Sequence, residues 1–176
     1  MSEKSAAHAI FLDESGVNLY MIRRYGWAKG QARVADSSPV NTPIITTIVG
    51  SISLDGSLTF STYQGGTTIE KFKNYLEQEL IPSLRPGDTV YLDNLGTHHS
   101  KKITNFLDEK GVHYEFLPPY SPDFNPIEML WSKIKDILRS MGIRTKESLT
   151  AGIEAAFKLI TRNDCRGWFK HCGYQR

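Results

Sequence analysis

The sequence contains very little cysteine and no long apolar run. Only Cys165 and Cys172 are present among 176 residues, which fits a reducing compartment better than a disulfide scaffold. No apolar stretch is long enough to span a membrane, and the first residues lack the apolar core and cleavage site of a signal peptide. These absences exclude a small disulfide-rich secreted domain and favour a cytoplasmic globular protein.

A strong excess of charge of one sign is also missing. The formal net charge is +2, but residues 1–100 hold 8 basic against 10 acidic residues (net −2), whereas residues 101–176 hold 13 against 9 (net +4). This gradient permits a polyanionic partner without requiring one. The length, with 40% hydrophobic residues and no internal repeat, predicts a single domain over residues 1–176.

The order of the apolar patterns predicts an α/β fold. The expected strands cover residues 9–12, 44–54, 57–61, 89–92 and 112–117, and the expected helices cover residues 67–81, 100–110, 127–141 and 146–161. Residues 13–16 are expected to end the first strand and Pro82 to end the first helix. An antiparallel opening followed by alternating strands and helices predicts a mixed five-stranded sheet flanked by helices.

A proline-rich loop leads into the helix at 127–141. A helix is excluded at the start of this loop by Pro118, Pro119 and Pro122. Asn125 followed by Pro126 is typical of an N-cap and a first helical residue. Glu128 then lies about 100° from Ile127 on the helical wheel, at the edge of the apolar stripe. It could be held by the core and still reach a cleft, or it could simply form a capping box with Asn125.

Two further acids follow apolar strands in closely similar contexts. Asp13 follows Ile10-Phe11-Leu12, and Asp93 follows Val90-Tyr91-Leu92. If the two strands are parallel, both acids lie at the carboxyl edge of the sheet, where α/β proteins keep their sites. Each acid alone could merely end its strand. Together with Glu128 they predict a site for Mg²⁺, which takes carboxylate oxygens and substrate phosphates. Two such ions would clamp the attacking and leaving oxygens of a phosphoryl displacement.

Three segments resemble the acidic-triad (DDE) transposases of the mariner superfamily, and most closely their bacterial insertion-sequence branch. They are Leu12-Asp13-Glu14-Ser15-Gly16, Leu92-Asp93-Asn94 with His98, and the stretch from Pro119 to Glu128. The last is the most specific. Thirty-four residues separate Asp93 from Glu128, the spacing of the branch whose third acid is Glu. The resemblance covers essentially the whole chain.

This resemblance implies a ribonuclease H-like fold, with an extra helix at the C-terminus, and cut-and-paste DNA transposition, typically into TA dinucleotides. It implies that Asp13, Asp93 and Glu128 bind two Mg²⁺ ions, which Mn²⁺ can replace, and that Asp13 is shared by both ions. It also implies a homodimer on DNA and association with the bacterial nucleoid.

Transposases of this type carry helix-turn-helix modules before the catalytic domain, and no such pattern precedes the first strand here. The expectation is therefore a catalytic fragment, or one product of a split reading frame, with a separate N-terminal DNA-binding segment. Two alternatives stay open. One is a ribonuclease H-like nuclease without strand transfer, and the other is a non-catalytic transposase remnant that dimerises with or inhibits an intact enzyme.

Several neighbours of the three acids are weaker candidates. Asn94 and His98 could orient a metal-bound water or touch a phosphate, although such residues often cap a helix. Trp27 could stack on a base or pack under the sheet edge. The candidate DNA-backbone contacts are Lys101, Lys102, Lys133, Lys135 and Arg139, which could equally be solvated helix faces. Trp131 lies on the apolar stripe and is assigned to the core.

Overall fold

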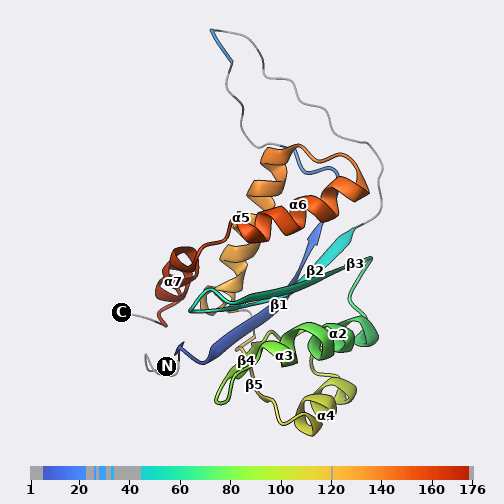
Figure 1. The fold of residues 1–176 in the computed structure, drawn as a ribbon, viewed down its shortest axis with the longest axis vertical. Coiled ribbons are helices and arrows are strands. Elements are labelled where there is room, and N and C mark those ends of the chain that lie inside the picture. The colour runs from blue at the N-terminus through green and yellow to red at the C-terminus, as the bar shows by residue number, and fades with distance from the viewer. Residues whose placement is uncertain are drawn as a thin grey trace.

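The centre of the fold is a mixed sheet with strand order β3-β2-β1-β4-β5 (Figure 1). The computed structural model describes residues 6–22, 26, 28–30, 33, 45–119 and 121–174. The strands are β1 (Ala9–Val17), β2 (Thr46–Ser53), β3 (Leu58–Gln64), β4 (Thr89–Leu92) and β5 (His113–Phe116). The first three pair antiparallel, whereas β4 pairs parallel with both β1 and β5. The predicted five-stranded mixed sheet is confirmed.

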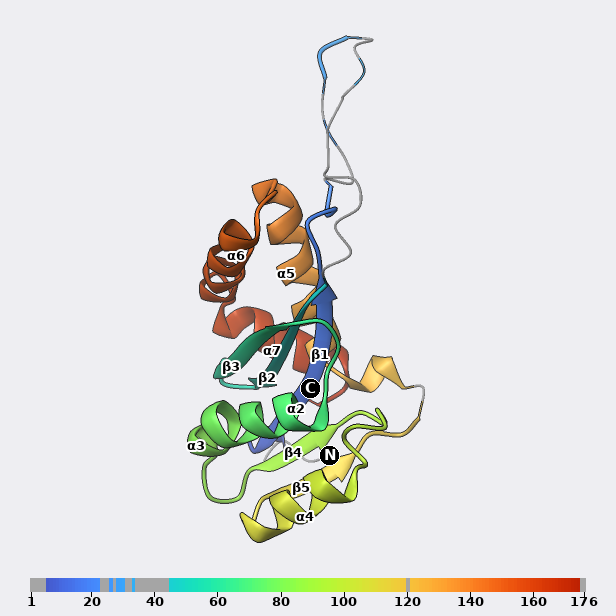
Figure 2. The same ribbon diagram turned by 90° about the vertical axis from the view of Figure 1, so that its right-hand side faces the viewer.

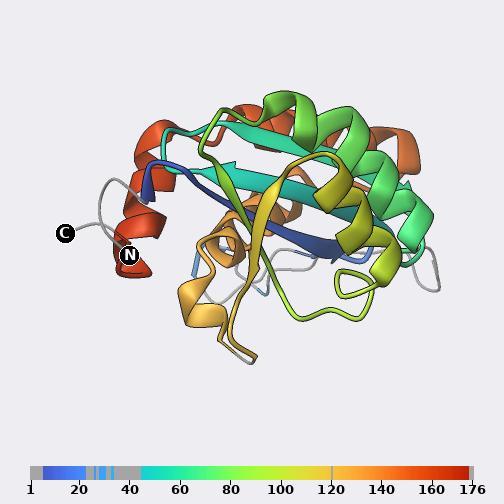
Figure 3. The ribbon, with the colours of Figure 1, turned by 90° about the horizontal axis from the view of Figure 1, so that it is seen from below.

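Helices cover both faces of this sheet. One face carries α5 (Ile127–Met141), α6 (Lys146–Lys158) and α7 (Arg162–His171). The other carries α2 (Ile69–Tyr75), a π-helical turn η1 (Leu76–Leu80), α3 (Ile81–Ser83) and α4 (Lys101–Glu109). Figure 3 shows this second face from below, with α2 and α4 in front of the strands. A single turn, η2 (Pro122–Phe124), lies in the segment that projects beside the sheet before α5 (Figure 2).

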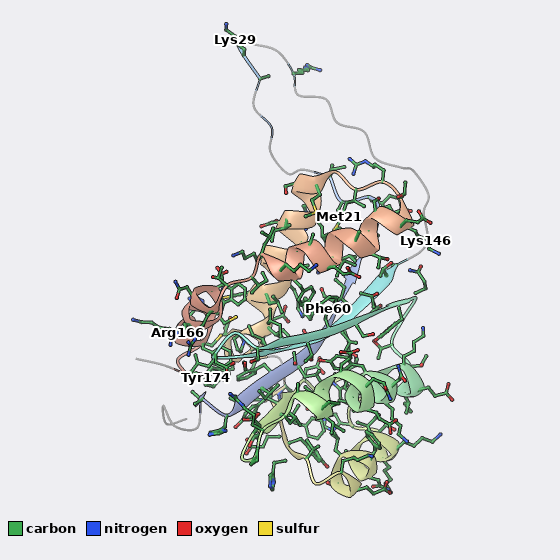
Figure 4. The ribbon with its side chains drawn as sticks, in the orientation of Figure 1. Met21, Lys29, Phe60, Lys146, Arg166 and Tyr174 are labelled. Carbon is green, nitrogen blue, oxygen red and sulfur yellow. The ribbon has the colours of Figure 1, made fainter. Side chains whose placement is uncertain are left out.

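The alternation of side chains along β1 divides the interior into two cores. Phe11 faces α7, where its ring centroid lies 5.3 Å from that of Phe169. Leu12 belongs to the core on the opposite face of the sheet. On the α5 side, Phe60 of β3 lies between the sheet and α6 (Figure 4), and its ring stacks on Phe157 at 3.9 Å. The sheet therefore separates consecutive residues of β1 into different environments.

Strand β1 continues past the predicted stop at residues 13–16. Its second half, from Asp13 to Val17, pairs antiparallel with Gly50 to Thr46 of β2. The prediction was wrong because the uninterrupted partner strand supplies backbone hydrogen bonds that override the local preferences of acid and glycine. The parallel pairing with β4 does end at Leu12. Asp13 is thus the first residue of β1 beyond the edge of β4.

Two helix boundaries also differ from the prediction. Pro82 lies within α3 rather than ending the preceding helix. The π-helical turn η1 directly precedes α3, so Pro82 lies in the first turn of α3, where a proline is tolerated. The predicted tail after residue 161 contains helix α7, which Thr161 caps through its side-chain oxygen. That helix carries few apolar residues, so its periodicity in the sequence is weak.

Neither cysteine takes part in a disulfide. Cys165 and Cys172 are free and buried, and burial raises the pKa of each thiol to about 11. Within the described ranges, no helix has the length and apolar character needed to cross a membrane.

Candidate active site

The register of the parallel strands brings Asp13 and Asp93 next to each other. The last residue pair between β1 and β4 is Leu12 with Leu92, and both side chains are fully buried. The next residue on each strand is the aspartate, at the carboxyl end of β4. This is the placement expected from the two similar strand sequences, because parallel strands end at the same edge of a sheet.

Glu128 reaches the same cleft from the first turn of α5. The cleft has a volume of about 400 Å³, and its lining includes Asp13, Asp93 and Glu128 together with Pro118, Pro119 and Pro122. Glu128 is solvent-exposed, whereas Ile127 beside it is fully buried in the core under α5. The core thus anchors the helix while its first acid stays free to face the cleft.

The alternative in which Glu128 forms a capping box does not match the geometry. Helix α5 begins after Pro126 and has no side-chain cap hydrogen bond. The buried Oδ1 atom of Asn125 has no hydrogen-bond partner, and the Glu128 amide donates to the backbone oxygen of Asn125 at 3.1 Å. The predicted Asn125 cap was therefore wrong. The preceding η2 turn gives Asn125 its own backbone amide partner, the oxygen of Pro122.

Asp13 is the most buried of the three acids. Only 8% of its surface is exposed, and the indole Nε1–H of Trp131 donates to its Oδ2 atom at 3.0 Å. Burial raises the pKa of Asp13 to about 7; the charges of Asp93 and Glu128 add to the rise, and a backbone hydrogen bond from Glu14 opposes it. The three carboxylates therefore act on one another electrostatically across the cleft.

Asp93 contacts His98, whose ring lies on the face of the sheet that carries α2 and α4. The His98 ring is fully buried, stacks on Phe72 at 4.4 Å, and places Nδ1 2.6 Å from Asp93 Oδ1. Its Nε2 atom lies 3.1 Å from Oε2 of Glu14. His98 is thus inaccessible to a phosphate, which corrects the suggestion of direct contact with substrate. Its contacts instead link Asp93 to a fourth acid that the sequence reasoning missed.

Asn94 ties the end of β4 to neighbouring segments. Its Nδ2 donates to the backbone oxygen of Leu117, and its Oδ1 lies 2.9 Å from Nε2 of His99. The side chain is exposed and lines the cleft. Asn94 therefore shapes the wall of the cleft after β5 and does not cap α4, whose N-cap is Ser100.

The candidate DNA-contacting residues do not form one surface. Lys101 and Lys102 are exposed in the first turn of α4, whereas the others lie on α5, across the sheet. On α5, Lys133 pairs with Asp164 at 2.6 Å, and Arg139 pairs with Asp136 at 2.5 Å. Lys135 is half-buried. The cleft is lined by none of these five residues. Trp27 lies outside the described residues.

A divalent cation fits the chemistry of the cleft. Within the part of the chain that the structure describes, no three His, Cys, Asp or Glu side chains are grouped tightly enough to hold a metal ion. The acids that line the cleft nevertheless offer only oxygen ligands, the type that Mg²⁺ and Mn²⁺ prefer. Burial is the main cause of the raised pKa of Asp13, and the negative charges of Asp93 and Glu128 add to it; a bound cation would offset both effects.

Comparisons with known proteins agree with this geometry. The sequence profile of a family described as DDE superfamily endonuclease matches residues 8–150. The Tc1 transposase of Caenorhabditis elegans is 25% identical over 164 residues, and the Tcb1 transposase of Caenorhabditis briggsae is 24% identical over 166 residues. Each match covers 88% of this chain and 60% of the relative. The chain thus spans about three-fifths of the length of these transposases.

Solved structures show the same fold. A pre-cleavage Mos1 transpososome matches with a TM-score of 0.73 and 17% identity, covering 96% of this chain and 54% of that one. The Mos1 transposase catalytic domain with raltegravir and Mg matches with a TM-score of 0.71 and 15% identity, covering 96% and 80%. The mixed sheet flanked by helices is therefore the ribonuclease H-like arrangement of such a catalytic domain, as the sequence resemblance predicted.

Proposed function

The chain belongs to the DDE superfamily of endonucleases, and from this premise we propose that it is the catalytic domain of a DNA transposase. It cleaves phosphodiester bonds at transposon ends and joins the released 3′-hydroxyl to target DNA. One observation carries the proposal: two adjacent strand ends and one helix start direct Asp13, Asp93 and Glu128 to a single cleft. If the three acids only ended strands and capped a helix, their side chains would not need to meet in one cleft.

The three acids are the proposed ligands of two divalent cations. Mos1 mariner paired-end complexes have been solved with Mg and with Mn, which supports the same ions here. When bound, the ions would supply Lewis-acid activation of the attacking oxygen and neutralise charge on the phosphate. Asp13, the most buried acid, is proposed as the ligand common to both ions. The protein's own contribution is to fix the carboxylates and to keep the cleft open to a DNA backbone.

DNA is the proposed partner. The similar Mos1 structures include a transpososome and a strand transfer complex, which supports action on transposon ends and target DNA, with TA as the expected target. A homodimer on DNA and a separate N-terminal DNA-binding segment are further parts of the proposal. The assignment to the bacterial insertion-sequence branch, with nucleoid association, stays a prediction from the sequence; the two curated relatives named above are nematode proteins.

The test is a paired cleavage and joining assay on labelled duplexes with Mg²⁺, Mn²⁺ or Ca²⁺. Mg²⁺ and Mn²⁺ should support both steps, and Ca²⁺ should bind without turnover because it tolerates looser geometry. Asp93→Ala and Glu128→Gln should abolish both steps while unfolding stays cooperative. Glu154→Ala, which removes an exposed acid from α6, is the matched control.

The outcomes separate the alternatives. Cleavage of an RNA–DNA hybrid without joining of DNA ends would indicate a ribonuclease H-like nuclease. Absence of any metal-dependent cleavage would indicate the non-catalytic remnant. Full activity in Asp93→Ala would contradict the mechanism itself.

A further inference from the structure

Trp131 makes a polar contact that its place in the core does not require. Its indole is 3% exposed, and its only polar atom, Nε1, donates to Oδ2 of Asp13 at 3.0 Å. An indole N–H is a donor with no acceptor capacity, so its partner must be a hydrogen-bond acceptor. A buried N–H usually finds a backbone carbonyl or a hydroxyl. Here it finds one oxygen of a proposed metal ligand, 118 residues away in the chain.

The indole is held by contacts with α6 and with β2. Its ring meets Phe157 of α6 edge-on, with centroids 6.4 Å apart. It also lies against Gly50 of β2, which pairs with Asp13 in the sheet. A Cβ atom at Gly50 would lie only 3.1 Å from Cη2 of Trp131. The absence of a side chain at position 50 therefore lets the indole lie across β2 and reach the carboxylate of Asp13.

The same helix also supplies the third acid. Trp131 follows Glu128 by three residues in α5, so the two side chains are neighbours on the helix surface. Helix α5 thus presents Glu128 to the cleft and contacts Asp13 with its next turn. A hydrogen bond to one carboxylate oxygen limits rotation of the carboxylate and so fixes the direction of the other oxygen. Such outer partners commonly orient metal ligands in proteins.

We propose that Trp131 is a positioning residue for metal binding, whose N–H orients the Asp13 carboxylate. The inference rests on the proposed function, because it assumes that Asp13 is a metal ligand. It differs from a purely structural role in a measurable way. A core residue affects stability, whereas a positioning residue affects metal affinity beyond any loss of stability.

The test removes only the N–H. Site-specific replacement of Trp131 by 3-benzothienylalanine keeps the size of the ring and exchanges the N–H for sulfur. Trp131→Phe is the natural-residue counterpart, although it also removes part of the ring. Ile153→Ala in α6 is the control for a loss of packing without loss of a donor, because Ile153 is fully buried in the same core. Mn²⁺ affinity is measured by titration calorimetry, and the melting temperature is measured on the same samples without metal.

The benzothienyl protein should bind Mn²⁺ roughly 10-fold to 100-fold more weakly than wild type, while Ile153→Ala should melt at a lower temperature but keep wild-type affinity. Wild-type affinity in the benzothienyl protein would overturn the positioning role and leave the proposed function intact. Equal weakening in Ile153→Ala would also overturn it, because packing alone would then explain the loss. A wild-type protein that binds no Mn²⁺ would overturn the inference and the proposed function together.

Discussion

Asp13 and Asp93 are neighbours in the sheet, but the protein supports them from opposite faces and with different chemistry. Asp13 receives a hydrogen bond from the neutral indole of Trp131 on the α5 side. Asp93 contacts the imidazole of His98, which Glu14 supports on the α2 and α4 side. A neutral donor orients a carboxylate but leaves its charge uncompensated. A cationic donor orients the carboxylate and also compensates its charge.

The pKa values of the two acids diverge accordingly. Burial raises the pKa of Asp13 to about 7, and the charges of its acidic neighbours add to the rise. Burial also acts to raise the pKa of Asp93, but the contact with His98, the backbone N–H of Leu95 and the charge of His99 together outweigh it, so that the pKa is lowered. Burial lowers the pKa of His98, but its contacts with Asp93 and Glu14 outweigh that effect and bring it to about 9. The metal-free site is therefore asymmetric.

The most direct test of this asymmetry is to replace each of the two aspartates by asparagine. In metal-free protein at pH 8, Asp13→Asn should raise the free energy of unfolding by as much as about 4 kcal/mol, because it removes a buried charge. Asp93→Asn should lower it by about 1 kcal/mol, because His98 loses its anionic partner. Denaturant unfolding in the presence of a chelator measures both. Shifts of the same sign would contradict the asymmetry.

The pH dependence sharpens the case of Asp13. Its pKa is about 7 in the folded protein and 3.8 as the reference value. Below the lower value the carboxyl group is protonated in both states, and the folded state keeps the proton longer as the pH rises. Between pH 3.8 and about 7, the free energy of unfolding of the wild type should therefore fall relative to that of Asp13→Asn. The fall should be at most roughly 1.4 kcal/mol per pH unit, and the difference should level off above about pH 7. A constant difference between the two proteins from pH 4 to 9 would refute the raised pKa.

Removing the support of Asp93 should have a smaller effect. His98→Ala deletes both ion-pair contacts and should weaken Mn²⁺ binding roughly 10-fold to 100-fold. Phe72→Leu is the control, because it removes the ring that stacks on His98 but leaves its contacts with the acids. Calorimetric titration of both variants with Mn²⁺ makes the measurement. Unchanged affinity in His98→Ala would mean that the backbone N–H of Leu95, which also donates to Asp93, suffices to place the carboxylate.

The three acids could be placed from the sequence because local patterns determine their positions. Asp13 and Asp93 each follow a short apolar strand, and parallel pairing alone then makes them neighbours. Glu128 lies at the edge of an apolar helical stripe, and burial of that stripe sets its direction. These inferences need only periodicity and strand direction, which adjacent residues carry.

Two of the supporting residues, Trp131 and Glu14, could not be found in this way. Trp131 fits the apolar stripe so well that its N–H offers no separate signal, and its bond with Asp13 spans 118 residues. The sequence predicted that the first strand ends at residues 13–16, which include Glu14. In the structure β1 stays paired with β2 through these residues, so Glu14 points to the face of the sheet opposite Asp13. Such contacts depend on how distant segments pack, which no local pattern records. The glycine at position 50, inside a strand rich in β-branched residues, was a hint of a close approach.

The smallest expected effect concerns the basic residues on the two faces. Lys101 and Lys102 are exposed at the start of α4, a few residues after Asp93, and they form no ion pair within the described part of the chain. Lys133 on α5 already pairs with Asp164, whose pKa is lowered because the contacts with Lys133 and Thr161 outweigh its burial. An unpaired lysine that meets a phosphate releases a counterion, whereas a paired one must first give up its partner.

Lys101→Gln and Lys102→Gln should each reduce the slope of log affinity against log salt by about one, and Lys133→Gln should reduce it by less. Fluorescence anisotropy with a random duplex between about 50 and 200 mM salt measures these slopes. The net charge of +2 predicts weak overall binding. The sequence shows no helix-turn-helix pattern that could read base edges, so transposon-end and scrambled duplexes should give the same order of effects. If Lys133→Gln alone changed the slope, the DNA would have to run along α5. Trp131, the neutral partner of Asp13, would then lie nearer the DNA backbone than His98, the cationic partner of Asp93.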